Sequence, residues 1–262
     1  MGHVALRGVR LAIEKRTLLG KVDLEVQPGE LVAVLGPNGV GKTTLLRTIA
    51  GFVKPGAGEV LLDGAPLVRL SQRERARGIT LLGEEVALPQ MSVREVVATG
   101  RFARRAWWRW SDDASGRQAV DAALRQVELA ELAERQFDTL SSGERQRARL
   151  ALALAQEAGV ILVDEPTSHL DVRFAFQILN LLRALARGPR SVVAVLHDLN
   201  EAAAVADRIV LLGDRAVLAD APPADALAPE LLERAFGVAF TRLDADGVVR
   251  VMPRAPATYT WS

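Results

Sequence analysis

Short apolar runs alternate with stretches of helical spacing over most of the chain. Residues 31–35, 160–163 and 192–196 form continuously apolar runs, which predict strands that are buried on both faces. Residues 42–50 and 172–187 carry apolar side chains at the spacing of a helix. Strands that alternate with helices in this way favour a parallel sheet with helices packed on it, an α/β fold.

The N-terminal part of the chain has a different pattern. Its first thirty residues alternate short apolar and polar runs and turn at Pro28-Gly29, which predicts antiparallel strands. Residues 59–62 and 65–68 flank Asp63-Gly64, a pair typical of a two-residue hairpin turn. We therefore expect an antiparallel β subdomain beside the parallel core.

Helical spacing without a strand pattern characterises the middle of the chain, which we interpret as an inserted helical subdomain. Pro222-Pro223 marks a turn into a short helical tail. We predict a single domain, 1–262, with a core of residues 1–83 and 155–220 that includes the β subdomain, a helical subdomain of residues 84–154 and a tail of residues 221–262.

The composition limits the class of protein. Hydrophobic residues make up 49% of the chain, yet no apolar run approaches the ~20 residues that a spanning helix needs. The start, MGHVALRGVR, lacks the apolar stretch of a secretory signal, and the absence of cysteine excludes disulfides and thiolate zinc sites. A formal net charge of +1 provides no general field for nucleic acid. We expect a soluble protein, compatible with a reducing cytosol.

A glycine-rich segment between the first buried strand and the following helix carries the clearest chemical signal. Residues 36–43 fit G-x-x-x-x-G-K-[ST] in the strand–loop–helix context of a phosphate-binding loop. Glycines let backbone N–H groups surround phosphate oxygens, and the helix start adds positive potential. Lys42 would bridge the β- and γ-phosphates, and Thr43 would bind Mg²⁺. The predicted nucleotide-binding loop comprises Gly36, Pro37, Asn38, Gly39, Val40, Gly41, Lys42, Thr43 and Thr44.

Two adjacent carboxylates, Asp164 and Glu165, follow the apolar run at 160–163. They would lie at the carboxyl end of a strand, where the ligands of open α/β sheets gather. Asp164 would hold Mg²⁺, and Glu165 would polarise the attacking water. An apolar strand that ends in Asp-Glu is more often a solvated strand end, but together with the phosphate-binding loop it favours phosphoryl-transfer chemistry.

A serine-rich segment, LSSGERQR at 140–147, opens a predicted helix. Ser141 or Ser142 can cap this helix, and Glu144 in the first turn suits the helix dipole. A plain N-cap accounts for the segment by itself. Its functional interpretation is a second anion site, in which a hydroxyl, backbone N–H groups and the dipole face a γ-phosphate.

The order of these motifs has a close parallel. The sequences GPNGVGKTT at 36–44, LSSGERQR at 140–147, ILVDEP at 161–166, SHLD at 168–171 and a strand that ends at His197 together resemble ATP-binding cassette (ABC) ATPases. The resemblance covers almost the entire chain. It implies a P-loop NTPase (RecA-like) parallel-sheet core with an N-terminal antiparallel β subdomain and an inserted α-helical subdomain, and an enzyme that uses ATP and Mg²⁺.

The resemblance also implies how the subunits work. In this family two ATPase subunits pack head to tail, and each ATP lies between the P-loop of one and the signature segment of the other. By that resemblance Ser141, Ser142 and Gly143 would reach the partner's ATP. Asp171 would lie in the loop that links the two sites, and His197 would contact the γ-phosphate.

Further segments are similar to one branch of the family. The stretch VREVVATGR at 93–101, residues 153–156, SHLD and HDLNEA at 197–202 look like the ATPases of iron-siderophore, haem and cobalamin importers. Those subunits serve transmembrane permeases at the cytoplasmic face of the inner membrane and, indirectly, a substrate-binding protein; we expect no nucleic acid. Cassette ATPases for another cargo, for nucleic acid or for cofactor assembly are the alternatives.

One position departs from the family pattern near the Mg²⁺ site. Family members usually carry a glutamine at the end of the strand before the helical insertion. Glu84 occupies the matching position, where a carboxylate can still bind Mg²⁺, and Gln90 is the alternative. We prefer Glu84, because Gln90 lies too close to the helix that is predicted to begin near Val93.

Two other positions depart from the family pattern, and one segment has an unusual composition. Ser142 stands where glycine is usual, and a serine resists positive φ. No aromatic residue precedes Phe52, so the position of the adenine-stacking ring falls nearest to Ile13. The segment 101–110, RFARRAWWRW, interleaves arginine with Phe and Trp. Packing of the helical subdomain is the favoured interpretation of Trp107, Trp108 and Trp110; contact with a partner or membrane surface, or base stacking, are alternatives.

Overall fold

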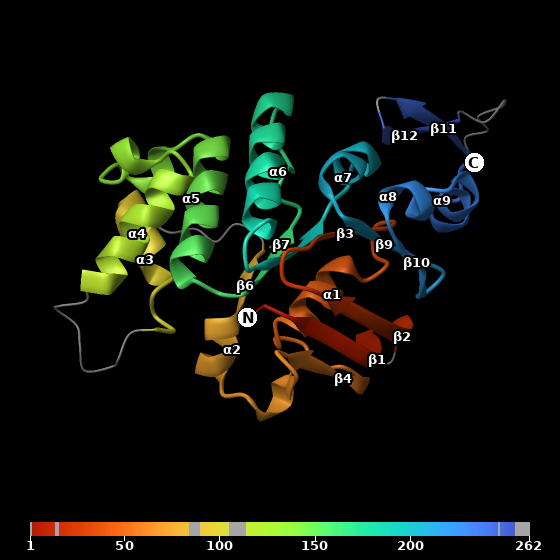
Figure 1. Cartoon of the computed structure of the whole chain (residues 1–262), viewed down its shortest axis with the longest axis horizontal. Coiled ribbons are helices and arrows are strands. Elements are labelled where there is room, and N and C mark those ends of the chain that lie inside the picture. The colour runs from red at the N-terminus through yellow and green to blue at the C-terminus, as the bar shows by residue number, and fades with distance from the viewer. Residues whose placement is uncertain (1, 14–15, 84–89, 105–113, 246, 255–262) are drawn as a thin grey trace.

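A six-stranded sheet forms the centre of the protein. The computed structural model describes residues 2–13, 16–83, 90–104, 114–245 and 247–254 (Figure 1). The strand order is β10-β9-β3-β8-β7-β6, in which β3, β6, β7, β8 and β9 pair in parallel and β10 is antiparallel to β9. The strands are β3 (Leu31–Leu35), β6 (Ile79–Leu82), β7 (Val160–Asp164), β8 (Ser191–Val195), β9 (Arg208–Gly213) and β10 (Ala216–Ala221).

The continuous apolar runs of the sequence arise because both faces of this sheet are covered. In β3, Leu31, Ala33 and Leu35 face one hydrophobic cluster, while Val32 and Val34 face another. The first cluster joins the sheet to α6 (Val172–Ala186), α7 (Leu199–Val205) and the helical subdomain. The second joins it to α1 (Lys42–Ile49) and the antiparallel sheet.

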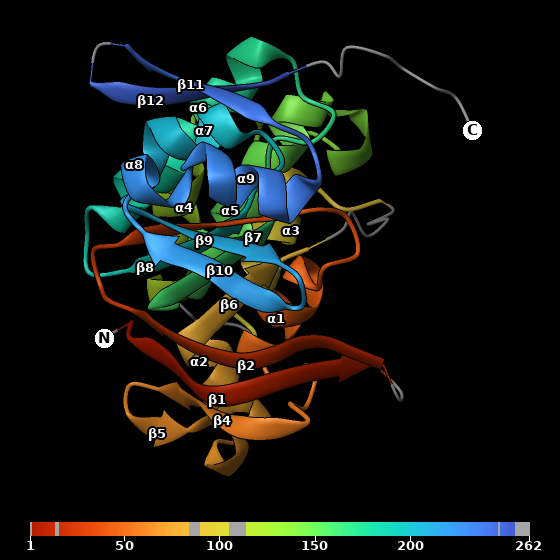
Figure 2. The ribbon, with the colours of Figure 1, turned by 90° about the vertical axis from the view of Figure 1, so that its right-hand side faces the viewer.

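The antiparallel sheet forms a separate layer, visible beneath the core sheet in Figure 2. Its order is β2-β1-β4-β5, with β1 (Val4–Ile13), β2 (Arg16–Val26), β4 (Ala57–Leu62) and β5 (Ala65–Pro66). The predicted hairpin at Asp63-Gly64 is present, but its second strand is shorter than predicted. Pro66 has no N–H to extend the ladder, and the chain continues as a 3₁₀ turn, η1 (Leu67–Arg69).

Helices predominate between β6 and β7, as the sequence predicts. They are α3 (Val93–Thr99), α4 (Ala114–Gln126) and α5 (Ser142–Gln156), with 3₁₀ turns η2 (Ala130–Leu132) and η3 (Phe137–Thr139); α2 (Gln72–Gly78) precedes β6. Three of the helices begin with the same capping box. The hydroxyls of Ser71, Ser92 and Ser141 accept the N–H of a glutamate three residues later, and each glutamate accepts the serine N–H.

The C-terminal tail differs from its prediction. After α8 (Pro223–Ala226) and α9 (Pro229–Phe236), β11 (Phe240–Ala245) and β12 (Val248–Pro253) form a hairpin, so a purely helical tail is wrong. Val249 and Val251 are buried on one side of the hairpin, which packs against α7 (Figures 1 and 2). The amide of Asn200 on α7 pairs with the backbone of Val251, accepting its N–H at 2.9 Å and donating to its carbonyl at 3.2 Å. This tertiary contact stabilises a strand pair that would be marginal alone.

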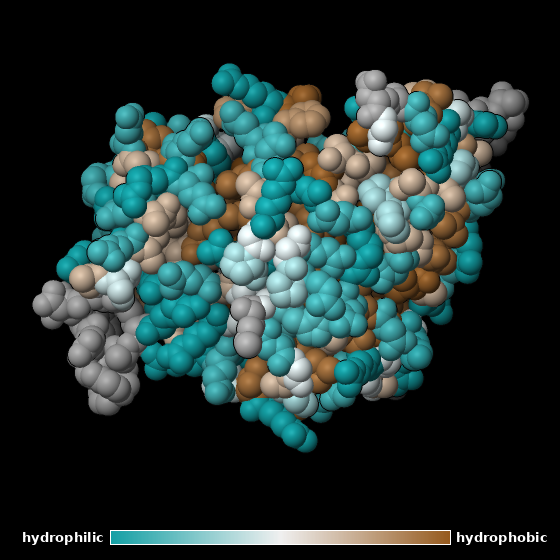
Figure 3. All heavy atoms as spheres, viewed as in Figure 1, coloured by the Kyte–Doolittle hydropathy of each residue, from teal (hydrophilic) through white to brown (hydrophobic). Residues whose placement is uncertain are grey.

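No helix in the described part of the chain combines the length and apolar character needed to cross a membrane. In the view of Figure 3, hydrophilic residues cover most of the surface, and apolar residues show in smaller areas between them. The 49% hydrophobic content is therefore largely accounted for by the two buried clusters.

Candidate nucleotide-binding site

Four neighbouring strands of the core sheet bring predicted site residues together at the carboxyl ends of the strands. The glycine-rich loop follows β3, His197 follows β8, Asp164 ends β7 and Gly83 follows β6. These strands are adjacent and parallel in the order β3-β8-β7-β6. Their carboxyl ends therefore meet, as they do at the ligand sites of other open α/β sheets.

The glycine-rich loop is tightly packed against the sheet. Gly36 has a φ of 148°, and an added Cβ atom would lie 2.5 Å from the carbonyl oxygen of Leu212, so only glycine fits here. Lys42 begins α1, and its buried side chain turns back into the loop. Its Nζ donates to the carbonyl oxygens of Gly36 at 2.7 Å and Pro37 at 3.1 Å. The lysine is thus held beside the backbone that would surround the phosphates.

A cavity of about 470 Å³ opens over this loop. Its lining joins residues of the loop to both predicted catalytic residues: Asn38, Gly39, Gly41, Lys42, Thr43, Thr44, Glu165, His197 and Leu18. Val40 instead packs on the hydrophobic cluster beneath. Leu18 of β2 is not predicted from the sequence, because its apolar character in an antiparallel strand does not show to which face its side chain points. Ile13, the position nearest to the expected adenine-stacking ring, is the last residue of β1.

Glu165 and His197 are in direct contact. Nε2 of His197 lies 2.6 Å from Oε1 of Glu165, and the hydroxyl of Ser168 donates to Oε2 at 3.2 Å. Glu165 has a φ of 50°, and its N–H donates to the carbonyl of Val195 at 3.1 Å, which extends the pairing of β7 with β8. A non-glycine residue in this left-handed conformation is uncommon and is often found at functional sites. Both oxygens of the carboxylate are therefore oriented by neighbouring side chains.

Asp164, directly before Glu165, is partly buried. Its Oδ1 is buried without a hydrogen-bond partner. Burial raises the pKa of Asp164, and the charge of Glu165 adds to this shift, while Thr43, Arg47 and Lys42 act in the opposite direction. An unpartnered buried carboxylate oxygen is costly, which suits a group that binds a cation.

The same cluster of charges acts on Lys42. Burial lowers the pKa of Lys42, and the nearby carboxylates of Glu165 and Asp164 oppose that shift. The lysine cation and the two carboxylates therefore compensate one another in part within the folded protein.

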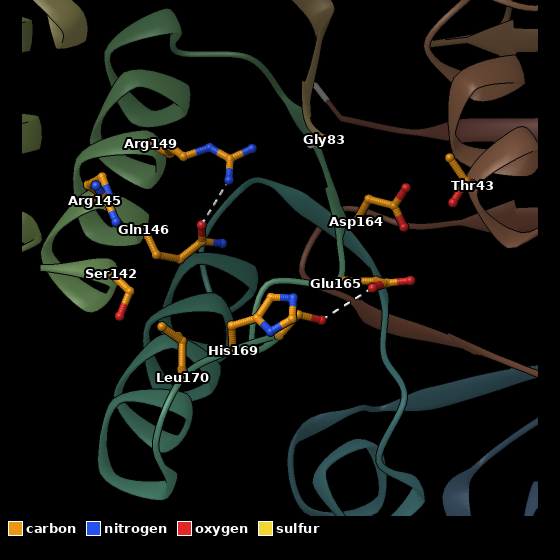
Figure 4. Close-up of a pocket in the computed structure, with 11 residues that line it drawn as sticks. Thr43, Gly83, Ser142, Arg145, Gln146, Arg149, Asp164, Glu165, His169 and Leu170 are labelled. Carbon is orange, nitrogen blue, oxygen red and sulfur yellow. Dashed lines mark hydrogen bonds between the residues drawn. The ribbon is translucent and has the colours of Figure 1, made fainter. Parts of the chain in front are cut away.

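A second cavity, of about 400 Å³, separates the core from α5. Figure 4 shows Thr43, Gly83, Asp164 and Glu165 on its core side and the side chains of α5 facing them. The α5 side consists of Ser142, Arg145, Gln146 and Arg149, and residues 168–170 lie between the two sides. Of the three predicted contact residues Ser141, Ser142 and Gly143, Ser142 lines this cavity.

Ser141 and Ser142 differ in their local roles. Ser141 is the N-cap of α5: its hydroxyl accepts the N–H of Glu144 at 3.3 Å, and its own N–H donates to Glu144 at 2.8 Å. Ser142 is the first helical residue and does not adopt a positive φ. The expected conflict between serine and positive φ is therefore wrong, because the helix begins at this position.

Gly143 and Asp171 belong to the contact between α5 and α6. An added Cβ atom at Gly143 would lie 2.9 Å from Cδ1 of Phe174. Asp171 is the N-cap of α6, and its Oδ1 accepts the N–H of Phe174 at 2.9 Å. Ser141, Gly143 and Asp171 line neither of the two cavities, and their predicted contact with a nucleotide stays a prediction.

The predicted loop glutamine falls at a gap in the described residues. Glu84 lies outside them; Gly83, directly before it, lines the cavity with Thr43 and Asp164. Gln90 is exposed in a turn with a φ of 59°. The choice between Glu84 and Gln90 stays a prediction.

The arginines of the segment 101–110 that the structure describes serve the end of α5. Nη1 of Arg101 donates to the carbonyl of Ala155 at 2.7 Å and to Glu157 at 2.6 Å. Arg104 donates to the carbonyls of Gln156 at 2.8 Å and Glu157 at 2.7 Å. Both satisfy carbonyls that a helix end leaves unpaired. Trp107, Trp108 and Trp110 lie outside the described residues.

Comparison with known proteins identifies the family. Residues 19–168 match the family model described as ABC transporter, more than half of the chain. The chain belongs to the ABC transporter family. This ABC protein is 40% identical over 250 residues to the hemin import ATP-binding protein HmuV of Rhodopseudomonas palustris strain HaA2, covering 90% of the chain and 92% of HmuV. It is 37% identical over 265 residues to the ferric enterobactin transport ATP-binding protein FepC of Escherichia coli K12, covering 97% of the chain and 96% of FepC.

A solved structure has the same fold over nearly its whole length. It is described as an inward-facing conformation of a metal-chelate type ABC transporter, and it matches with a TM-score of 0.83 and 26% identity over 97% of this chain and 98% of that chain. The predicted P-loop NTPase fold and the resemblance to ABC ATPases are both confirmed. The ABC protein is accordingly an ATPase.

Proposed function

We propose that this ABC ATPase powers an importer for a metal chelate of the iron-siderophore or haem type. Relatives that are similar over nine-tenths or more of the chain are named for hemin import and ferric enterobactin transport, and the matching solved structure is of metal-chelate type. The sequence resemblance adds cobalamin as a third cargo. The single observation that carries the ATPase part is the contact of His197 with Glu165 beside the P-loop cavity.

The proposed reaction is hydrolysis of the bond between the β- and γ-phosphates. Glu165 orients a water molecule and accepts its proton as the water oxygen attacks the γ-phosphorus; the leaving group is ADP and the product inorganic phosphate. His197 holds Glu165 through the 2.6 Å contact and reaches the γ-phosphate from the same edge. Lys42 and the loop amides bind the phosphates, where they stabilise charge in the transition state.

We propose that Thr43 and Asp164 hold Mg²⁺ with the phosphates of ATP. A hydroxyl and a carboxylate are the hard oxygen donors that Mg²⁺ prefers, and the unpartnered Oδ1 of Asp164 fits a cation. No group of three or more His, Asp or Glu side chains among the described residues is placed to hold a metal. That agrees with an ion that takes its other ligands from phosphate and water. Bound Mg²⁺ would neutralise phosphate charge; Glu84 is the third predicted ligand.

The proposed working unit is a head-to-tail dimer on transmembrane permease subunits. In it Ser141, Ser142 and Gly143 of one subunit reach the ATP of the other, and Asp171 lies between the two sites. Ser141, Ser142 and Asp171 are exposed in the single chain and are thus accessible to a partner subunit, which supports this arrangement. The subunit would lie at the cytoplasmic face of the membrane and respond indirectly to a substrate-binding protein. We expect no nucleic acid.

Replacing Glu165 by Gln tests the ATPase part. We expect E165Q to lower steady-state hydrolysis about 100-fold or more, because the amide cannot accept the proton. The same variant should bind ATP with Mg²⁺ and run as a dimer in size-exclusion chromatography. E74Q, which changes a distant capping glutamate, is the control and should hydrolyse normally. Unchanged hydrolysis in E165Q would remove Glu165 as the base.

The cargo is tested in proteoliposomes that contain this chain together with its candidate permease. A ferric siderophore, haem or cobalamin is supplied with its binding protein, and both uptake and ATP hydrolysis are measured. Uptake of a metal chelate that depends on ATP and is lost with E165Q supports the proposal. Stimulation by an unrelated solute, with none by the three chelates, contradicts it.

A further inference from the structure

A hydrogen bond joins the segment after β7 to the helix after β8. The hydroxyl of Thr167 donates to Oε2 of Glu201 at 3.0 Å. Thr167 lies just beyond Glu165, and Glu201 lies on α7, which begins directly after His197 and its N-cap Asp198. In the described part of the chain, this bond and the contact of His197 with Glu165 link the same two segments.

Glu201 departs from the pattern set by the other capped helices. Glu74, Glu95 and Glu144 occupy the third helical position, and each accepts the N–H of its own N-cap serine at 2.8 Å. Glu201 occupies the same position in α7, where its N–H donates to Asp198 at 3.0 Å. Its carboxylate, however, turns away from its own cap to Thr167. Local capping therefore does not account for the direction of this side chain.

The contact with Thr167 offsets only part of the cost of burying the Glu201 carboxylate. Burial raises the pKa of Glu201, and the charge of Asp198 adds to that shift, while the hydrogen bond from Thr167 opposes it. The charged form is thus less favourable in the folded protein than in water. A carboxylate kept there at a cost to folding is typical of a residue that serves function.

We infer that Glu201 is a positioning residue: through Thr167 it fixes the start of α7 against the segment that carries Glu165, and so keeps His197 in contact with Glu165. On its other side α7 is held by the two hydrogen bonds of Asn200 to Val251. Loss of the Thr167 contact would let the start of α7, with His197, move relative to Glu165. This inference rests on the proposed roles of Glu165 and His197.

Steady-state ATP hydrolysis of the full-length protein tests it. We expect E201A and T167V each to lower kcat about 10- to 100-fold, with KM for ATP within about twofold of the wild type, since small displacements of reacting groups have effects of this size. E201Q and T167S keep an acceptor and a donor, and should retain kcat within about threefold. The double variant E201A/T167V should be no slower than either single variant.

E74A is the matched control, because it removes a glutamate from the same helical position far from the site. Equal losses of kcat in E74A and E201A, or a kcat in E201A within twofold of the wild type, overturn the inference. So does a loss in E201Q as large as in E201A. If E201A does not fold, the inference is tested by comparing the kcat of T167V with that of T167S. E165Q and H197A are measured in parallel: if both hydrolyse ATP normally, the proposed function fails; if both are inactive and E201A is normal, only this inference fails.

Discussion

Gly143 of α5 lies directly against the ring of Phe174 of α6, and an added Cβ atom would approach Cδ1 to 2.9 Å. The signature segment and the segment that contains Asp171 are therefore packed as one unit, because Asp171 caps the helix that carries Phe174. A change at either side of this contact should move the other.

We expect G143A to destabilise the protein by about 1–3 kcal/mol, the usual effect of overpacking. It should also lower ATP hydrolysis, since it displaces a predicted nucleotide-binding segment. F174A provides space for the new methyl group, so G143A/F174A should lose less stability than the sum of the single variants. Urea unfolding of the four proteins measures this. Strict additivity would show that the two side chains do not meet.

A second prediction concerns the buried carboxylate Asp164. Its pKa is raised in the folded protein, so the stability linked to its protonation is fully present below the ordinary pKa of 3.8 and is lost as pH rises through the folded pKa. Near neutral pH the charge is therefore unfavourable for folding. D164N should raise Tm by about 2–4 °C at pH 7 in the absence of Mg²⁺ and nucleotide.

This stabilisation should shrink as pH is lowered toward 3.8, because the wild-type side chain becomes neutral as well. D164N should at the same time lose Mg²⁺-dependent hydrolysis. Calorimetry at several pH values and an assay with increasing Mg²⁺ measure the two effects. A lower Tm for D164N at pH 7 would contradict the proposed conflict between folding and metal binding.

A third prediction uses two arginines with similar contacts and different burial. Arg101 has a side-chain exposure of 7% and Arg104 of 34%. R101M removes donors from the buried carbonyl of Ala155 and should cost about 2–4 kcal/mol. R104M should cost about 1 kcal/mol or less. Denaturant unfolding measures the loss of stability in each variant. Equal losses would mean that burial does not control how much these arginines contribute to stability.

A fourth prediction concerns the residue that takes the place of the loop glutamine. We expect E84Q to change the Mg²⁺ dependence of hydrolysis or its coupling to transport, because Gly83 beside it lines the cavity with Asp164. Q90A, at an exposed turn, should leave both unchanged. The reverse result would make Gln90 the functional residue.

Local signals in the sequence account for much of the fold and the site. Apolar runs predict β3, β7 and β8 because these strands are buried on both faces. The glycine pattern at 36–41 predicts a phosphate-binding loop, because its conformation excludes most side chains. The C-terminal hairpin was missed, since β11 and β12 depend on packing against α7 and the amide of Asn200 rather than on a strong pattern of their own.

By itself, then, the sequence determined where the phosphate-binding motif and the adjacent carboxylates stand and which segments are buried. These properties depend on residue type and on spacing over a few positions. Only the tertiary structure decided that β8 lies between β3 and β7, and hence that His197 meets Glu165 beside Lys42. Only the tertiary structure shows that the carboxylate of Glu201 bonds to Thr167 and not to the cap of its own helix. Contacts between distant segments depend on strand order and packing, which no short stretch of sequence encodes.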